Sequence, residues 1–186
     1  VFEGLNANMY RAAGLPAVGV EVRVVDDEDN ELPRGEVGEI IVRGPNIMLG
    51  YWQQPEMTAE VLRGGWMHSG DGGYMDDRGF VFIVDRMKDM VISGGENVYS
   101  AEVEDSLYQH AAVVECAVIG IPDDRWGEAV HAVVRLQHGA DTSAEELIAH
   151  SHTLIAGFKC PRGITFVEEP LPLSGAGKIL KAELRV

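Results

Sequence analysis

The chain has 186 residues, of which 46% are hydrophobic and 24% charged, enough for one ordinary domain or two small domains with a buried core. Its formal net charge of -15 repels phosphate backbones and anionic lipid, which argues against nucleic acid or a membrane surface as a partner. No run of about 18 consecutive apolar residues is present, so no transmembrane segment is predicted. The two cysteines, Cys116 and Cys160, form no CxxC pattern, which favours a cytoplasmic protein without a disulfide framework or zinc site.

The first 84 residues predict a β-rich part with glycine-rich turns. Valines alternate with charged residues over 20–24, and further strands are predicted over 37–43 and 79–84. A short helix is predicted from Pro55 to Arg63, because proline is favoured in the first turn of a helix.

From Asp85 onward the pattern changes to alternating strands and helices. Strands are predicted over 89–93, 113–119, 129–136 and 164–167. Helices are predicted over 101–108 with Ser100 as the cap, from a Thr142–Glu145 capping box to about Ala156, and over 177–185. The fold class is therefore α+β. The change of pattern predicts a domain boundary at Asp85, with a β-rich part over residues 1–84 and an α+β part over residues 85–186.

The segment Gly175–Lys178 is not a phosphate-binding loop, because Pro172 and Ile179 occupy the positions of its first glycine and its Ser or Thr. What remains is a glycine loop that presents one lysine, Lys178. A compact ammonium on such a loop suits a site where a carboxylate and a phosphate react. The alternative is a surface lysine beside a turn.

Two further segments carry candidate site residues. Asp71, predicted on a tight turn, can accept hydrogen bonds from both hydroxyls of a ribose, or it can cap the turn. Asp85 and Arg86 lie at the predicted domain junction and suit either a hinge or an exposed turn. Gly94 and Gly95 can form a simple turn, or can let a narrow ligand approach the backbone.

The runs 65–71, 85–99 and 173–181, in this order, resemble the carboxyl-terminal portion of the adenylate-forming family, which includes acyl-CoA synthetases, peptide-synthetase adenylation domains and luciferases. The resemblance implies that residues 1–84 are the β-rich end of a large AMP-binding domain. It implies that residues 85–186 form a small, mobile α+β domain with a short central sheet flanked by helices. It also implies one role for each matching residue. Asp71 would bind the ribose of AMP, and further nucleotide contacts would come from Arg86, Lys88 and Asn97. The pantetheine tunnel of CoA would be faced by Gly94 and Gly95. Asp85 would be the hinge, and Lys178 would promote adenylation.

The run 88–99 is similar to that of fatty-acyl-type CoA ligases. It implies an ATP-dependent acyl-CoA synthetase of fatty acid metabolism that activates a carboxylic acid as acyl-AMP and transfers it to CoA. One alternative is an adenylating domain that loads a carrier protein. Another is a non-catalytic interaction module, against which the presence of Asp71 and Lys178 argues.

The family's phosphate loop and its Tyr-Gly-x-Thr-Glu segment, whose glutamate holds Mg²⁺, do not occur in this sequence. Both are expected upstream of Val1, in a missing amino-terminal domain that would be a partner of this chain. The chain also lacks an initiator Met, which suggests that it is part of a larger ligase. A homo-oligomer is compatible with these features. The isolated chain is expected to form no acyl-adenylate, and ATP–pyrophosphate exchange above background would contradict this.

Overall fold

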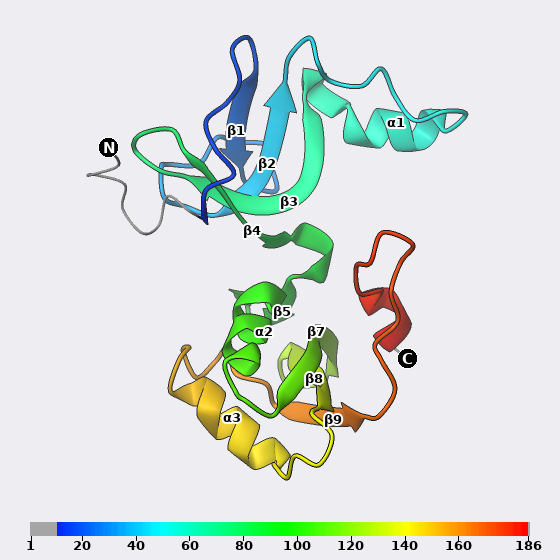
Figure 1. Cartoon of the computed structure of the whole chain (residues 1–186). Coiled ribbons are helices and arrows are strands. Elements are labelled where there is room, and N and C mark those ends of the chain that lie inside the picture. Colours follow the sequence, from blue (N-terminus) through cyan, green and yellow to red (C-terminus); the bar gives the residue numbers. More distant parts are fainter. Residues whose placement is uncertain (1–10, 186) are drawn as a thin grey trace, which may run out of the picture. The chain divides into compact units, whose positions relative to one another are not determined.

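The computed structural model describes residues 11–185 and divides into two compact units, residues 1–88 and residues 89–186 (Figure 1). Each unit combines a mainly antiparallel sheet with one or two helices. The predicted α+β class is therefore confirmed. Among the described residues, no helix is both long enough and apolar enough to span a bilayer.

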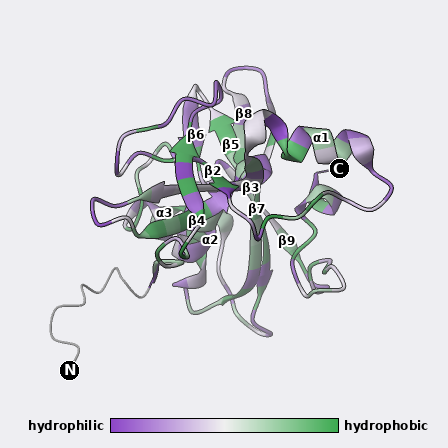
Figure 2. Ribbon diagram, turned by 90° about the horizontal axis from the view of Figure 1, so that it is seen from above, coloured by the Kyte–Doolittle hydropathy of each residue, from purple (hydrophilic) through white to green (hydrophobic). Residues whose placement is uncertain are grey.

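The first unit is built on a four-stranded antiparallel sheet in which sequential strands are neighbours. Its strands are β1 (Glu21–Val25), β2 (Gly38–Arg43), β3 (Met67–Met75) and β4 (Val81–Arg86). The helix α1 (Pro55–Val61) and a 3₁₀ turn (Arg63–Gly65) connect β2 to β3. Figure 2 shows both hydrophobic and hydrophilic residues along α1, and none of its residues is buried. The core of this unit instead lies on the sheet, at Val24, Ile40, Met75 and Val81.

Strand β3 is a correction to the sequence analysis, because Asp71 lies inside it and not on a tight turn. Its glycines made the segment look like a turn, yet Gly73 is required by the sheet. A Cβ at Gly73 would collide with the carbonyl oxygen of Phe82 on β4. The register shifts between Gly72 and Gly73, and this irregularity places Asp71 opposite Arg86.

The junction between the units also falls later than the sequence analysis places it. The compact units divide between Lys88 and Asp89, not between Val84 and Asp85. Strand β4 continues to Arg86, because Asp85 and Arg86 pair with Gly72 and Asp71 on β3. A 3₁₀ turn over Met87–Asp89 then connects the two units.

The second unit is a five-stranded sheet with the order β6-β5-β8-β7 and with β9 paired to β8 in parallel. Its strands are β5 (Val91–Ser93), β6 (Glu96–Val98), β7 (Val113–Asp123), β8 (Gly127–Leu136) and β9 (Gly163–Val167). Its helices are α2 (Ser100–Tyr108) and α3 (Ala144–His152). Successive residues of β7 point to opposite faces, so Cys116 and Val118 join one apolar cluster with Leu107 and Leu147 of the helices. Ala117 and Ile119 join another cluster with Leu171.

Both predicted helix caps in this unit need correction. Ser100 is the first residue of α2, Tyr99 is the N-cap, and the Ser100 hydroxyl instead accepts a hydrogen bond from Lys181 Nζ at 2.6 Å. The capping box of α3 is formed by Ser143 and Glu146, one residue later than the expected pair. This helix ends at His152 and not near Ala156.

The helix predicted over 177–185 is absent, which is a further correction. Leu173 and Ile179 form an antiparallel bridge, and Gly177 adopts a φ of 75°, a value that an α-helix does not use. Only a 3₁₀ turn over Lys181–Leu184 follows. Lys178 therefore lies on a hairpin and not on a helix.

Candidate functional site

In the first unit, Asp71 and Arg86 form an ion pair across β3 and β4. Arg86 Nε lies 3.1 Å from Asp71 Oδ1, and the two side chains are 49% and 30% exposed. The Asp71 amide donates to Ser69 Oγ at 3.1 Å, and Ser69 Oγ donates to the carbonyl of Ile40 at 2.7 Å. The carboxylate is thus held in place while it stays within reach of a ligand.

Asp71 lies at a shallow apolar pocket of about 250 Å³. Its lining includes Leu15, Ile40, Val42, Val81, Ile83 and the polar residues Ser69 and Asp71. Pockets of this type bind a ligand through their apolar walls and orient it through a few polar groups. A planar base with a hydroxyl-bearing sugar has this combination of properties.

Glu39 fixes the backbone that leads to Asp71. One of its carboxylate oxygens accepts from the Gly70 amide at 3.0 Å, and the other lies 2.8 Å from Nδ1 of the buried His68. Gly70 has a φ of 69°, in the left-handed region. Glu39 received no role in the sequence analysis, which placed it only within the strand predicted over residues 37–43.

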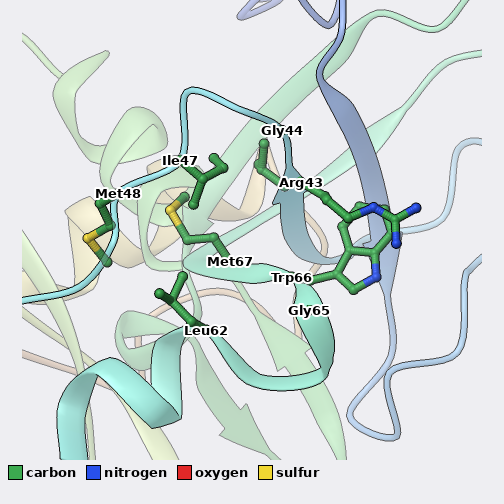
Figure 3. A pocket seen from close by; sticks show the side chains of 9 residues that line it. Arg43, Gly44, Ile47, Met48, Leu62, Gly65, Trp66 and Met67 are labelled. Carbon is green, nitrogen blue, oxygen red and sulfur yellow. The ribbon is translucent and has the colours of Figure 1, made fainter. Parts of the chain in front are cut away.

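A second pocket of about 300 Å³ lies where the connection between β2 and β3 returns to the sheet (Figure 3). Trp66 stands at this pocket, and the guanidinium carbons of Arg23 and Arg43 lie 4.7 and 4.3 Å from its ring centroid. Figure 3 shows Arg43 against the Trp66 ring and Ile47, Met48, Leu62 and Met67 around the apolar side. None of the candidate site residues lines this pocket.

The other candidates of the first unit follow Asp71 and Arg86 along β4. Asp85 Oδ1 accepts from the Arg86 amide at 2.7 Å. Lys88 is exposed on the 3₁₀ turn that follows β4. The structure therefore brings Asp71, Asp85 and Arg86 together, with Lys88 two residues farther along the chain.

In the second unit, Gly94 and Gly95 form the tip of the β5–β6 hairpin, with φ angles of 65° and 84°. The Gly94 amide donates to the carbonyl of Trp126 at 2.8 Å. A Cβ at Gly94 would lie 2.7 Å from the Trp126 ring, whereas at Gly95 it would meet open space. Asn97 is exposed on β6, opposite Ile92.

The indole of Trp126 carries two guanidinium groups, a feature that the sequence analysis did not predict. The guanidinium carbons of Arg125 and Arg162 lie 4.5 and 4.6 Å from the ring. This arrangement places two positive charges beside the Gly94 turn in a chain of net negative charge. Arg125 is adjacent to Trp126 in sequence, but Arg162 is brought there by the segment that precedes β9.

Lys178 is exposed on the hairpin between Leu173 and Ile179. Its amide donates to Ser174 Oγ at 3.1 Å, and its carbonyl accepts from the Ser174 amide at 2.7 Å. The structure therefore carries Lys178 on a different hairpin from Gly94, Gly95 and Asn97. Across residues 11–185, no cluster of three or more His, Cys, Asp or Glu is arranged to hold a metal ion.

Two family models match the chain. Residues 3–52 match the model of the AMP-binding enzyme, and residues 102–178 match that of the AMP-binding enzyme C-terminal domain. Together they cover more than half of the sequence.

Curated relatives include synthetases with different acyl substrates and acceptors. A feruloyl-CoA synthase from Amycolatopsis sp is 51% identical over 96% of this chain and 36% of its own. A long-chain-fatty-acid–CoA ligase of Salmonella typhimurium is 47% identical over 92% of this chain and 30% of its own. The fatty acid–[acyl-carrier-protein] ligase ScoC of Streptomyces coeruleorubidus is 46% identical over 96% of this chain and 34% of its own. The chain thus spans about a third of the length of these relatives.

Solved structures show the same similarity. ATP-bound MatB from Rhodopseudomonas palustris superposes with a TM-score of 0.86 at 42% identity, over 94% of this chain and 35% of that one. The o-succinylbenzoate CoA synthetase MenE of Bacillus subtilis, in complex with its acyl-adenylate, gives 0.88 at 35% identity, over 96% and 37%. With both family models matched, the recognition made from the sequence is confirmed, and the chain belongs to the AMP-binding, adenylate-forming enzyme family.

Proposed function

We propose that the complete enzyme containing this chain is an ATP-dependent acyl-CoA synthetase. It would activate a carboxylic acid as acyl-AMP and transfer the acyl group to CoA. The observation that carries the proposal is the Asp71 carboxylate at the edge of an apolar pocket, in a chain whose relatives include CoA ligases.

Asp71 is the proposed ribose ligand. Its carboxylate can accept both sugar hydroxyls, and charge-assisted hydrogen bonds of this kind are stronger than neutral ones. Arg86, Lys88 and Asn97 are the proposed further nucleotide contacts. Arg86 lies within ion-pair distance of Asp71, which supports the proposal that it contacts the same nucleotide.

In the first half-reaction, a carboxylate oxygen of the acid attacks the α-phosphorus of ATP. The new O–P bond gives acyl-AMP, and pyrophosphate leaves with the electrons of the bond that breaks. Lys178 would stabilise the negative charge shared by the carboxylate and the phosphate as they approach. Mg²⁺, proposed to be held by a glutamate outside this chain, would neutralise phosphate charge.

In the second half-reaction, the CoA thiol attacks the acyl carbonyl, its proton is released, and AMP leaves. Gly94 and Gly95 are the proposed CoA contacts. A narrow ligand could approach the backbone at Gly95, where the position of a Cβ is open space, whereas at Gly94 this position is taken by the Trp126 ring. The guanidinium groups of Arg125 and Arg162 would attract the phosphates of CoA.

A carrier protein is the second candidate acceptor, because the relative ScoC is a fatty acid–[acyl-carrier-protein] ligase. Both acceptors present a phosphopantetheine thiol to the same acyl-adenylate. The two acceptors are distinguished by a competition experiment. The enzyme is given a radiolabelled acyl substrate with equal concentrations of CoA and phosphopantetheinylated carrier protein, and the label on each acceptor is measured. Faster labelling of the carrier protein would overturn the CoA proposal and leave the adenylation step intact.

Replacing Asp71 tests the nucleotide site directly. Asp71→Ala in the complete enzyme is expected to raise the KM for ATP about tenfold or more, since hydrogen bonds to charged groups contribute about 1.5–3 kcal/mol. The preference for ATP over 2′-deoxy-ATP should also shrink towards one. The measurement is ATP–pyrophosphate exchange with both nucleotides. Asp77→Ala, in the exposed turn after β3, is the matched control. If Asp71→Ala still prefers ATP over 2′-deoxy-ATP as strongly as the parent enzyme does, Asp71 is not the ribose ligand.

The hinge at Asp85 is also a proposal. Because Asp85 lies in β4, its test must separate an effect on the hinge from damage to this strand. Asp85→Pro fixes φ and removes an amide opposite Gly72, whereas Asp85→Ala deletes only the carboxylate that accepts from the Arg86 amide. We expect Asp85→Pro to impair one half-reaction about tenfold more than the other, because small displacements of reacting groups are costly. Adenylation and thioester formation are measured separately, with circular dichroism to monitor folding. Equal rates in both steps for Asp85→Pro and the parent would make Asp85 an ordinary strand residue.

A further inference from the structure

Lys181 is unusually enclosed for a lysine. Its side chain is 12% exposed, and its Nζ lies 2.7 Å from Glu104 Oε1 and 2.6 Å from Ser100 Oγ. Both partners belong to α2. A buried ammonium has a large desolvation cost and is retained where it is paired and hydrogen-bonded. Lys181 belongs to none of the contacts proposed above for the nucleotide or CoA.

The site that receives Lys181 is itself fixed to the core. Glu104 Oε1 also accepts from the Val118 amide on β7 at 2.7 Å. Ser100 is fully buried at the start of α2. The ion pair therefore attaches the chain near Lys181 to the helix α2 and, through Glu104, to strand β7.

This attachment lies at the base of the hairpin that carries Lys178. Immediately before Lys181, the Leu180 amide donates to the carbonyl of Pro172 at 2.8 Å and closes the hairpin. On the other side, the buried Leu171 donates its amide to Glu115 Oε2 at 3.2 Å. The pKa of Glu115 is held below its usual value, chiefly by a hydrogen bond from Arg135, so this acceptor stays charged at neutral pH. Both ends of the hairpin are thus tied to the unit, while its tip is exposed.

We propose that Lys181 is a positioning residue for adenylation, which fixes the hairpin to α2 so that Lys178 is presented in one place. The inference rests on the proposed function of Lys178. A long, exposed side chain can stabilise a transition state efficiently only if its backbone is already placed. Lys181 acts through the hairpin and touches no substrate, because its ammonium is already engaged by Glu104 and Ser100.

The first test measures the hairpin itself, in the 186-residue chain, by amide hydrogen exchange. The variants are Lys181→Met, Glu104→Gln and the double variant that combines them. The double variant removes both charges of the ion pair, so it leaves no unpaired buried charge that would unfold the chain. We expect the amides of Ser174, Gly177 and Leu180 to exchange about tenfold faster in all three, the effect of losing a charge-assisted hydrogen bond. The amides of β7 and β8 should keep their protection.

Lys159→Met is the matched control. Lys159 Nζ lies 2.8 and 2.7 Å from the two carboxylate oxygens of Glu102, so it makes a comparable ion pair with the same helix but precedes β9 and not the hairpin. This variant should leave hairpin exchange unchanged. Equally accelerated hairpin exchange in Lys159→Met, or unchanged hairpin exchange in Lys181→Met, would overturn the proposal that Lys181 fixes the hairpin to α2.

The second test measures catalysis in the complete enzyme. Adenylation by Lys181→Met and by Glu104→Gln is expected to fall about tenfold in kcat with little change in the KM for ATP, and the double variant should lose no more than either single variant. Thioester formation from added acyl-adenylate should be unchanged. Additive losses, or normal adenylation with a loosened hairpin, would overturn the positioning role. If Lys178→Ala itself adenylates normally, the function proposed for Lys178 fails. The exchange data then still support or overturn the attachment of the hairpin to α2 by Lys181.

Discussion

Lys178→Ala is expected to slow acyl-adenylate formation by the complete enzyme about 100-fold or more, the size of effect seen when one preorganised charge-stabilising donor is lost. Thioester formation from preformed acyl-adenylate should change far less, because the charge that Lys178 stabilises develops only in the first step. The exposed position of Lys178 on its hairpin leaves the ammonium available for this purpose. Single-turnover measurements of each half-reaction separate the two effects.

Lys178→Arg is the matched control, because it keeps the positive charge but replaces the compact ammonium. A planar guanidinium delivers the same charge in a different geometry, so partial recovery is expected. The Ser174 hydroxyl and the backbone bonds of the hairpin do not involve the Lys178 side chain, so neither variant should unfold the chain. Equal losses in the two half-reactions would show that Lys178 contributes to folding or general binding instead.

Gly94→Ala is expected to be far more damaging than Gly95→Ala, although the two glycines are neighbours. Both have positive φ angles, so alanine costs about 1–2 kcal/mol of conformational strain at either position. Only at Gly94 would the added Cβ press against the Trp126 ring. We therefore expect the Gly94 variant to lose about 2–5 kcal/mol in the free energy of unfolding, since the clash adds a second strain of about 1–3 kcal/mol.

The functional effect should follow the same order. Displacement of Trp126 would also move Arg125 and Arg162, whose guanidinium groups stack on it. In the complete enzyme, Gly94→Ala should reduce thioester formation about tenfold or more and leave adenylation nearly unchanged. Urea unfolding of the chain and the two separate half-reactions are the measurements. Similar behaviour of the two alanine variants would show that the Trp126 contact is unimportant.

The sequence pattern was informative wherever side-chain alternation or local chemistry decides the structure. Valines at alternate positions predicted β1, and two apolar runs predicted β7 and β8, which pair with each other. The motifs also led to the correct family, because they depend on residue identity and order. These are local properties that a single segment carries by itself.

The errors arose where distant segments decide the outcome. Asp71 lies in a strand because β2 and β4 pair with its glycine-rich segment, a contact that local propensity does not express. Ser100 is a typical helix cap by residue type, yet its hydroxyl binds Lys181, which is far away in sequence. The position of Arg162 against Trp126 likewise depends on tertiary packing.

The register of β3 and β4 has an energetic consequence for the proposed enzyme. A nucleotide that uses the Asp71 carboxylate as its acceptor competes for it with Arg86, whose amide is bonded to Asp85. Nucleotide binding at Asp71 and the hinge proposed at Asp85 would therefore both involve Arg86. By thermodynamic reciprocity, any junction conformation that the nucleotide favours must in turn bind the nucleotide more tightly by the same factor. Such a linkage would need no long pathway through the protein, since Asp85 and Arg86 are neighbours on β4 and Arg86 pairs with Asp71 on β3.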